Sequence, residues 1–162
     1  MKRLYFILVL WIGKFGNVLC KIFHKSGTMI SGKVAVKLQK NFVKYFRNID
    51  YDKVIFITGT NGKSTTTNLV SHTVKMAGKK VATNTEGANM MSGVATTLIK
   101  NSSLFGKFNK EFLILEIDER SLRNIFKVLP AKNLCITNLQ KDQVQRNGDP
   151  DFIYQMLLLK QT

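Results

Sequence analysis

The stretch "ITGTNGKSTTTNLV", residues 57–70, decides the fold, because a short glycine-containing turn in it joins an apolar run to a helical pattern. The turn is Gly59-Thr60-Asn61-Gly62-Lys63-Ser64 and directly follows a predicted strand at residues 54–58. Glycines let the backbone wrap closely around an anion, the first amides of the following helix point at it, and a lysine reaches the outer phosphates. The turn therefore predicts a phosphate-binding site, with a glycine-rich turn of purely structural use as the alternative.

The turn departs from the general P-loop pattern G-x-x-x-x-G-K-[ST]. That pattern requires a glycine five positions before Gly62, where this chain has Ile57. The residue after the lysine, Ser64, is still in place to put its hydroxyl on a Mg²⁺ ion. We therefore expect a shortened phosphate loop that binds a nucleotide together with Mg²⁺.

Apolar runs alternate with helical stretches through the second part of the chain. Nearly continuous apolar runs indicate strands that are buried on both faces, which is typical of a parallel sheet between two helix layers. The pattern therefore predicts the α/β fold class, with a parallel sheet and a P-loop-like nucleotide turn. The predicted strands lie at residues 54–58, 81–83, 112–117 and 134–139.

The predicted helices have their own start and stop signals. Gly78 is placed to end the helix that follows the turn, and Pro130 to end a helix that begins near Glu119. Asp118 and Glu119 suit a helix start, because acidic side chains complement the helix dipole there. The first of these helices is expected to bury an apolar stripe made of Leu69, Val70, Thr73, Val74 and Ala77.

Length and charge narrow the possibilities further. With 162 residues and 44% apolar content, the chain is long enough for one domain with a core. It has 25 basic and 10 acidic residues, a net charge of +15, which favours polyanionic partners. Residues 1–50 contain ten Lys or Arg and a single acidic residue, Asp50. Because these basic residues do not alternate with an aromatic platform or lie in a helix-turn-helix, we expect no nucleic acid partner.

The first 25 residues predict a basic amphipathic helix. The apolar run from Leu4 to Ile12 is shorter than the roughly 20 residues that cross a bilayer. A small-residue cleavage site is missing, and Leu19 before Cys20 does not suit lipoprotein processing. Three interpretations stay open: a helix packed on its own domain, a helix on a membrane surface, and a signal or anchor.

The two cysteines, Cys20 and Cys135, are 115 positions apart and have only His24 and His72 as other soft ligands. They therefore indicate neither a disulfide framework nor a zinc site. Isolated cysteines fit a reducing compartment, so we expect a cytoplasmic protein. It would be peripheral at the inner face of the membrane if the N-terminal helix binds lipid.

The loop "TGTNGKST", residues 58–65, resembles the nucleotide loop of the Mur ligases, whose signature T-G-T-x-G-K-[ST] also lacks the earlier glycine. Further segments resemble the MurT branch of that family, and the likeness covers nearly all of residues 1–159. At Gln143, MurT proteins have glutamine where many other Mur ligases have histidine. The segments are "NTEGANM" (84–90), "LEIDE" (115–119) and "TNLQKDQVQRNGD" (137–149).

The resemblance implies an ATP-dependent carbon–nitrogen ligase of peptidoglycan synthesis with a three-layer α/β fold. Residues 1–50 would be an N-terminal basic helix and connector, and residues 51–162 an incomplete central ATP-binding domain. MurT-type enzymes activate the D-glutamate α-carboxylate of lipid II as an acyl phosphate, and ammonia from a GatD-type glutaminase then forms D-isoglutamine. The implied partners are therefore that glutaminase and lipid II at the membrane surface.

The implied cofactors are ATP and Mg²⁺, and the implied catalytic residues are Lys63 and Glu116. Lys63 would neutralise the outer phosphates, and Ser64 and Glu116 would share the metal ion. Thr85 and Asn89 would lie near the γ-phosphate and the incoming carboxylate. The residues expected to bind the nucleotide are Gly59, Thr60, Asn61, Gly62, Lys63, Ser64, Thr65 and Asn89.

Alternatives remain for the site and for the whole chain. From its position alone, Glu116 could instead cap the next helix or pair with Arg120. Family members continue into a four-cysteine zinc ribbon and a C-terminal ligase domain, neither of which lies within these 162 residues. The chain is thus expected to be the N-terminal part of a ligase that needs the missing domain, or a non-catalytic nucleotide-binding fragment. A folylpolyglutamate synthase-like ligase would share the loop, but residues 85–90 and 141–149 fit it less well.

Overall fold

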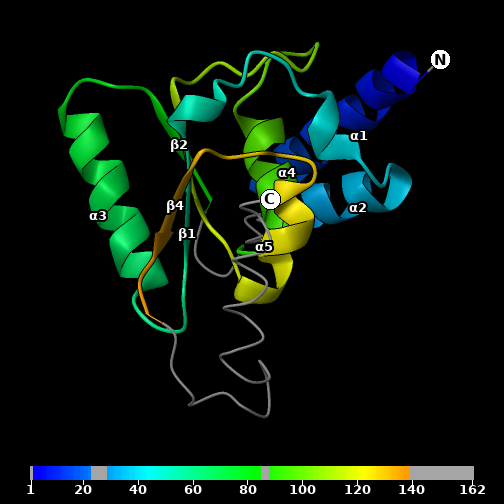
Figure 1. Cartoon of the computed structure of the whole chain (residues 1–162). Helices are drawn as coiled ribbons and strands as arrows, with labels where there is room; N and C mark the ends of the chain where they lie inside the picture. The colour runs from blue at the N-terminus through cyan, green and yellow to red at the C-terminus, as the bar shows by residue number, and fades with distance from the viewer. Residues whose placement is uncertain (1, 23–28, 85–87, 139–162) are drawn as a thin grey trace.

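The chain folds around a parallel sheet, shown in the computed structural model of Figure 1. The structure describes residues 2–22, 29–84 and 88–138. The described sheet has four strands in the order β2-β3-β1-β4, and each neighbouring pair is parallel. The predicted α/β class with a parallel sheet is confirmed. The strands are β1 (Val54–Thr58), β2 (Val81–Thr83), β3 (Phe112–Glu116) and β4 (Asn133–Ile136).

Helices cover both faces of this sheet. Helix α3 (Lys63–Met76) lies on one face, and α4 (Met91–Lys100) and α5 (Glu119–Phe126) lie on the other (Figure 1). Alternate strand residues supply the two faces, because successive side chains of a strand point in opposite directions. Phe56 joins the main hydrophobic cluster with Leu98 of α4, and its neighbour Ile57 is fully buried outside that cluster.

The N-terminal helices pack outside α4. They are α1 (Lys2–Ile22) and α2 (Ile30–Leu38), and short 3₁₀ turns at Phe42–Tyr45 and Tyr51–Lys53 lead into β1. The Phe6 ring of α1 lies 5.1 Å from the Phe42 ring and 5.2 Å from the Phe46 ring, so aromatic contacts fix α1 to this connector. The same hydrophobic cluster reaches the sheet, and it therefore contains residues from both sides of the predicted boundary at residue 50.

Helix α3 buries a different stripe from the predicted one. Thr67 and Ser71 are buried against the sheet, whereas Leu69 is 65% exposed. The helix begins directly at the glycine turn, and its first residues bond to groups at the edge of the sheet, as described below. Those polar contacts set the rotation of α3, so small hydroxyl residues face the strands in place of the predicted leucine.

Strand β4 and helix α5 also differ from expectation. The apolar run at 134–139 predicts burial on both faces, but Leu134 and Ile136 are exposed. Within the described residues β4 is an edge strand that pairs with β1, and α3 contacts the other three strands. Helix α5 ends at Phe126, four residues before the predicted stop at Pro130, and in the turn between them Val128 N and Leu129 N both donate to the Ile125 carbonyl oxygen.

Candidate functional site

The predicted site residues lie at the carboxyl edge of the sheet, where each strand is followed by a glycine or ends near a polar side chain. Gly59 follows β1, Asn84 follows β2, Glu116 ends β3, and Asn138 lies just beyond β4. In parallel α/β sheets, ligands bind outside the carboxyl ends of the strands. In Figure 1 the β1–α3 loop lies at the lower end of the sheet. The fold therefore gathers residues that are far apart in sequence around one loop.

Gly59 is the residue that lets the loop leave β1. Its φ of 131° lies in a region that residues with a side chain rarely adopt. A Cβ atom there would also meet Thr137 Oγ1 and lie 2.7 Å from the Asn138 carbonyl oxygen. Gly62, with φ 80°, is exposed and directly precedes α3. The loop thus needs its first glycine for both conformation and space.

Residues beyond β4 hold the loop from the side. Thr60 N donates to the Asn138 carbonyl oxygen at 2.9 Å, and Asn61 N donates to Asn138 Oδ1 at 2.9 Å. In return, Thr137 Oγ1 donates to the Asn61 carbonyl oxygen at 2.7 Å. Sequence reasoning missed Thr137 and Asn138 as site residues because it extended the strand to residue 139. A strand ending at Ile136 would have placed both at the carboxyl edge.

Lys63 is the first residue of α3, and its side chain folds back into the loop. Its Nζ donates to the carbonyl oxygens of Gly59 and Thr60, the latter at 3.1 Å. It also lies 3.5 Å from Glu119 Oε1. Glu119 is only 3% exposed, so this carboxylate is buried beside the ammonium group. The positive charge predicted for the phosphate site is therefore held inside the turn.

Glu119 has a second role that the sequence reasoning missed. It is the first residue of α5, as expected, and Asp118 caps that helix by accepting from Arg120 N at 3.0 Å. The contact between Glu119 and Lys63 joins residues that are 56 positions apart in the sequence. The sequence signal that could have placed Glu119 in the site was its position three residues after Glu116, at the same strand-to-helix junction.

Ser64 and Glu116 face each other across the loop. Ser64 Oγ donates to Glu116 Oε2 at 2.7 Å, and Asn89 Nδ2 lies 3.5 Å from Glu116 Oε1. Asn84 fixes the Glu116 backbone, because its Nδ2 donates to the Glu116 carbonyl oxygen at 2.7 Å and its Oδ1 accepts from Glu116 N at 2.8 Å. The carboxylate therefore has a defined position at the end of β3.

The Ser64 and Glu116 oxygens fit a Mg²⁺ site. Mg²⁺ prefers oxygen ligands, and it is commonly held by one or two protein groups together with substrate phosphates. Among residues 2–22, 29–84 and 88–138, no group of three or more His, Cys, Asp or Glu side chains could hold a metal ion. The donor set therefore suits a metal ion shared with a bound phosphate, in place of a site built from protein ligands alone.

The structure brings most of the predicted residues together. Thr65 follows Ser64 on the first turn of α3, where its side chain is exposed, and its predicted role stays a prediction. Thr85, Gln143 and the rest of the segment after Asn138 lie outside the described residues. The predicted residues that meet at the carboxyl edge are Gly59, Thr60, Asn61, Gly62, Lys63, Ser64, Asn89 and Glu116.

Comparison with known proteins gives the same family. Residues 57–156 match the Mur ligase middle domain. The chain is 32% identical over 142 residues to the lipid II isoglutaminyl synthase (glutamine-hydrolyzing) subunit MurT of Staphylococcus aureus, covering 88% of this chain and 31% of that protein. It is 37% identical over 132 residues to the MurT subunit of Streptococcus pneumoniae, covering 82% of this chain and 29% of that protein.

A more distant relative is the UDP-N-acetylmuramoylalanine–D-glutamate ligase of Wolbachia pipientis. The identity is 34% over 96 residues, which cover 59% of this chain and 16% of that ligase. This chain thus spans about a third of the length of the MurT relatives. The resemblance seen in the loop and in the MurT-like segments is confirmed, and the chain belongs to the Mur ligase family.

Proposed function

We propose that this chain is the nucleotide-binding part of an ATP-dependent carbon–nitrogen ligase of peptidoglycan synthesis. The observation that carries the proposal is the loop Gly59–Ser64, in which a lysine and a hydroxyl group each face a buried carboxylate. A positive charge and a pair of oxygen ligands side by side are what a Mg²⁺-bound nucleotide phosphate requires. The names of the MurT relatives support the same class of reaction.

Lys63 would act on the charge of the transferred phosphoryl group. In the present structure its Nζ contacts two loop carbonyl oxygens and Glu119. Phosphate oxygens entering the loop would take over part of these contacts, and the ammonium group would then stabilise negative charge as the phosphoryl group moves. Glu119 would keep the lysine directed into the loop before the phosphate arrives.

Ser64 and Glu116 are the residues that would hold Mg²⁺. The ion supplies neutralisation of the phosphate charge and orients the reacting oxygens. Asn84 fixes the Glu116 backbone at both its N–H and its carbonyl group, so the residue that carries the carboxylate is held in place without the ion. Asn89 would contact the incoming carboxylate, and the position of its amide beside Glu116 supports this proposal.

The finer proposal concerns the substrate. The α-carboxylate of D-glutamate in lipid II would attack the γ-phosphate of ATP, displace ADP and form an acyl phosphate. Ammonia from a GatD-type glutaminase would then attack the acyl carbon, with loss of phosphate and formation of D-isoglutamine. The match covers 31% of the Staphylococcus aureus relative, and in this proposal residues outside the matched segment complete the site. The loop contacts by themselves are equally compatible with a second candidate, a nucleotide-binding segment without its own turnover.

Isothermal titration of Mg-ATP into the purified chain tests the nucleotide site. We expect binding to the unchanged chain and at least a tenfold loss of affinity in Lys63→Ala, with folding checked by circular dichroism. The matched control is Lys75→Ala, a change in the last turn of the same helix, which should leave the affinity unchanged. Equal affinities for the unchanged chain and Lys63→Ala would contradict the proposed role of the loop.

A second experiment separates the ligase from the segment without turnover. Lipid II, ATP and ammonia are incubated with the chain alone, and with the chain plus the C-terminal part of the Streptococcus pneumoniae MurT subunit. Mass spectrometry then measures amidation. We expect product only in the supplemented mixture, and the loss of that product in Lys63→Ala. Amidation by the chain alone would contradict the need for a further domain.

A further inference from the structure

Helix α1 is apolar on two opposite faces, and only one of them is used inside the domain. Phe6, Val9 and Leu10 are buried in the main hydrophobic cluster. At 100° per residue, the side chains on the opposite side of the helix are also large and apolar, and Phe15 among them is 65% exposed. A helix that only packs on its own domain would have polar residues there. The exposed side chains on this side include Leu4, Leu8, Trp11, Ile12, Phe15 and Val18.

The loop between α4 and β3, which is distant from α1 in sequence, extends this apolar surface. Trp11 Nε1 donates to the Leu104 carbonyl oxygen at 3.0 Å, which brings α1 beside the loop that follows α4. Leu104 and Phe105, at the tip of that loop, are both exposed. Gly106 then packs against the Phe6 ring, where a Cβ atom would lie 2.7 Å from Phe6 Cζ. We call the surface formed by Leu8, Trp11, Ile12, Phe15, Leu104 and Phe105 the α1 face.

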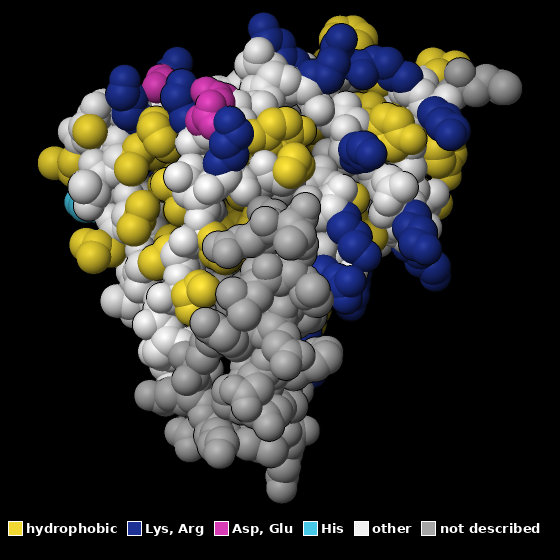
Figure 2. Space-filling view, in the orientation of Figure 1, with side chains coloured by type: hydrophobic (Ala, Val, Ile, Leu, Met, Phe, Trp, Pro, Cys, Tyr) yellow, Lys and Arg dark blue, Asp and Glu magenta, His cyan; other side chains and the backbone are white. Residues whose placement is uncertain are grey.

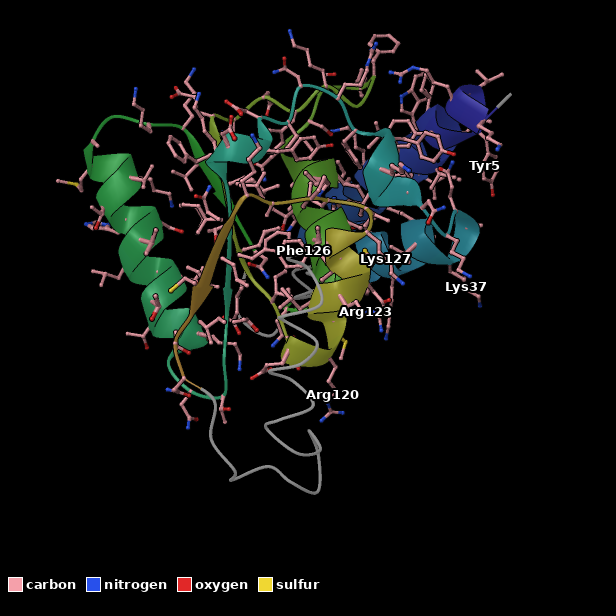
Figure 3. The ribbon with its side chains drawn as sticks, viewed as in Figure 1. Tyr5, Lys37, Arg120, Arg123, Phe126 and Lys127 are labelled. Atoms are coloured by element: carbon pink, nitrogen blue, oxygen red, sulfur yellow. The ribbon has the colours of Figure 1, made fainter. Side chains whose placement is uncertain are left out.

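The segments that form the α1 face and α2 beside it carry basic residues and no acidic ones. Residues 1–49 contain no Asp or Glu. Figure 2 shows Lys and Arg side chains, with hydrophobic side chains between them, over the α1 and α2 side of the molecule, and the visible Asp and Glu at the upper left. Tyr5 Oη donates to the Leu38 carbonyl oxygen of α2 at 3.0 Å, and Figure 3 shows Tyr5 and Lys37 at the same end of the molecule. The exposed basic residues on α1, on α2 and in the loop after α4 include Lys2, Arg3, Lys33, Lys37 and Lys107.

We propose that the α1 face docks on a membrane surface that contains anionic lipids, with α1 lying in the plane of the interface. Apolar side chains would enter the boundary between headgroups and acyl chains, and the surrounding lysines would contact lipid phosphates. Trp11 and Tyr5 suit this depth, because each has an apolar ring and one polar group. A uniformly negative lipid surface complements a surface without acidic residues. A second copy of the chain would bring like charges together.

The same helix is long and apolar enough to cross a membrane when only length and composition are considered. Spanning would require α1 to leave the domain, which would expose Phe42 and Phe46 and remove the Lys14 bonds to the Ile99 and Ser102 carbonyl oxygens. A helix lying on the surface keeps all of these contacts. Docking through the outward side of the helix is therefore the mode that the fold favours over spanning.

The proposal rests on this surface and not on the ligase reaction. Trp11 is the single tryptophan of the chain, so its fluorescence reports the environment of the α1 face directly. The chain is mixed with vesicles of phosphatidylglycerol and phosphatidylcholine, or of phosphatidylcholine alone. We expect a blue shift of the emission and flotation of the protein with the anionic vesicles, and binding at least tenfold weaker without phosphatidylglycerol.

Two sets of variants test which side chains are responsible. Leu8→Ser with Phe15→Ser should weaken binding to the anionic vesicles at least tenfold, and Lys33→Gln with Lys37→Gln should weaken it several-fold. The matched control is Leu69→Ser with Met76→Ser, which changes two exposed apolar side chains of α3 on the far side of the sheet and should leave binding unchanged. Mg-ATP titration of the same samples measures whether the nucleotide site is intact. A failure of the docking proposal can therefore be distinguished from a failure of the nucleotide-binding proposal.

Three results would overturn the proposal. The first is an unshifted Trp11 emission with no flotation on anionic vesicles. The second is vesicle binding that Leu8→Ser with Phe15→Ser leaves unchanged. The third is a dimer, measured by light scattering, that these two substitutions dissociate, because the α1 face would then be covered by a second copy of the chain.

Discussion

The hydroxyl of Ser64 donates to a carboxylate oxygen of Glu116 at 2.7 Å, across the gap between the start of α3 and the end of β3. If this pair holds Mg²⁺, removing the charge of the carboxylate should remove the metal dependence of nucleotide binding. In the unchanged chain we expect ATP affinity to fall at least tenfold when EDTA replaces Mg²⁺. In Glu116→Gln we expect most of that difference to disappear, because the amide keeps the shape but not the charge.

Glu111→Gln is the control for this prediction. Glu111 is a half-exposed carboxylate just before β3, where it forms a surface pair with Lys79 at 3.8 Å. Its substitution should leave the metal dependence intact. Full Mg²⁺ dependence in Glu116→Gln, measured by the same titration, would assign the metal ion to other ligands.

Lys63 and Glu119 should affect stability and nucleotide binding in different ways. Lys63→Ala leaves the buried Glu119 without its positive partner, and we expect the free energy of unfolding to fall by about 1–3 kcal/mol. Combining Lys63→Ala with Glu119→Gln removes the unpaired charge, so most of that stability should return while nucleotide binding remains lost. Urea unfolding measures the first effect and titration of Mg-ATP the second. A double variant as unstable as Lys63→Ala would show that the pair is not what stabilises the loop.

Gly59 and Gly16 should respond differently to replacement by alanine. Gly59→Ala puts a side chain at φ 131° and against Thr137 and Asn138, so we expect a loss of about 1–3 kcal/mol in stability. Gly16 lies within α1, and a Cβ atom there would have no neighbour within 4 Å. Gly16→Ala should therefore be neutral or add up to about 1 kcal/mol, because alanine favours helix. Thermal unfolding of both variants checks this contrast, and equal melting temperatures would contradict it.

Lys14 should stabilise the contact between α1 and the end of α4. Its Nζ donates to the Ile99 and Ser102 carbonyl oxygens at 2.8 and 2.6 Å. Replacement by methionine keeps the apolar stem but leaves both oxygens without this donor, so we expect a loss of about 1–2 kcal/mol. Lys75→Met, on the exposed end of α3, should change stability by less than about 0.5 kcal/mol. Similar urea midpoints for the two variants would show that the Lys14 bonds add nothing.

The contribution of Lys14 to the free energy of unfolding should increase with pH. Burial lowers the pKa of Lys14 from its usual 10.5. Near that pH the folded chain therefore binds fewer protons at Lys14 than the unfolded chain does. Taken alone, this side chain makes folding more favourable as the pH rises through its lowered pKa toward 10.5. The stability difference between the unchanged chain and Lys14→Met should accordingly widen over that interval.

The strands and the loop could be predicted because their signals are local. A strand buried on both faces needs a continuous apolar run, so β1 and β2 were predicted at their observed residues. The glycine turn was recognisable because close backbone approach to an anion needs residues without a side chain. Both inferences depend on neighbouring residues alone, and single-sequence reasoning handles that well.

The rest depended on contacts between distant segments. The buried side of α3 is set by Ser64 and Lys63 meeting carboxylates 52 and 56 positions later, so the stripe through Leu69 was wrong. The role of Glu119 as the partner of Lys63 depends on the second of these contacts, and its position at a helix start did not reveal it. The sequence predicted a basic amphipathic helix at residues 1–25, but it left open whether the apolar residues pack on the domain or face outward, because that depends on contacts with distant segments such as Phe42 and Leu104.

The hydrogen bonds between the loop and Asn138 have a consequence for how the protein is made. Asn61 meets Asn138 across 77 positions, so the loop lacks these partners while the chain is still emerging from the ribosome. A nascent chain that has reached only α3 contains the whole glycine turn but not the residues that hold it. Nucleotide could therefore stabilise the growing protein only after β4 has been synthesised and paired with β1, late in the translation of this segment.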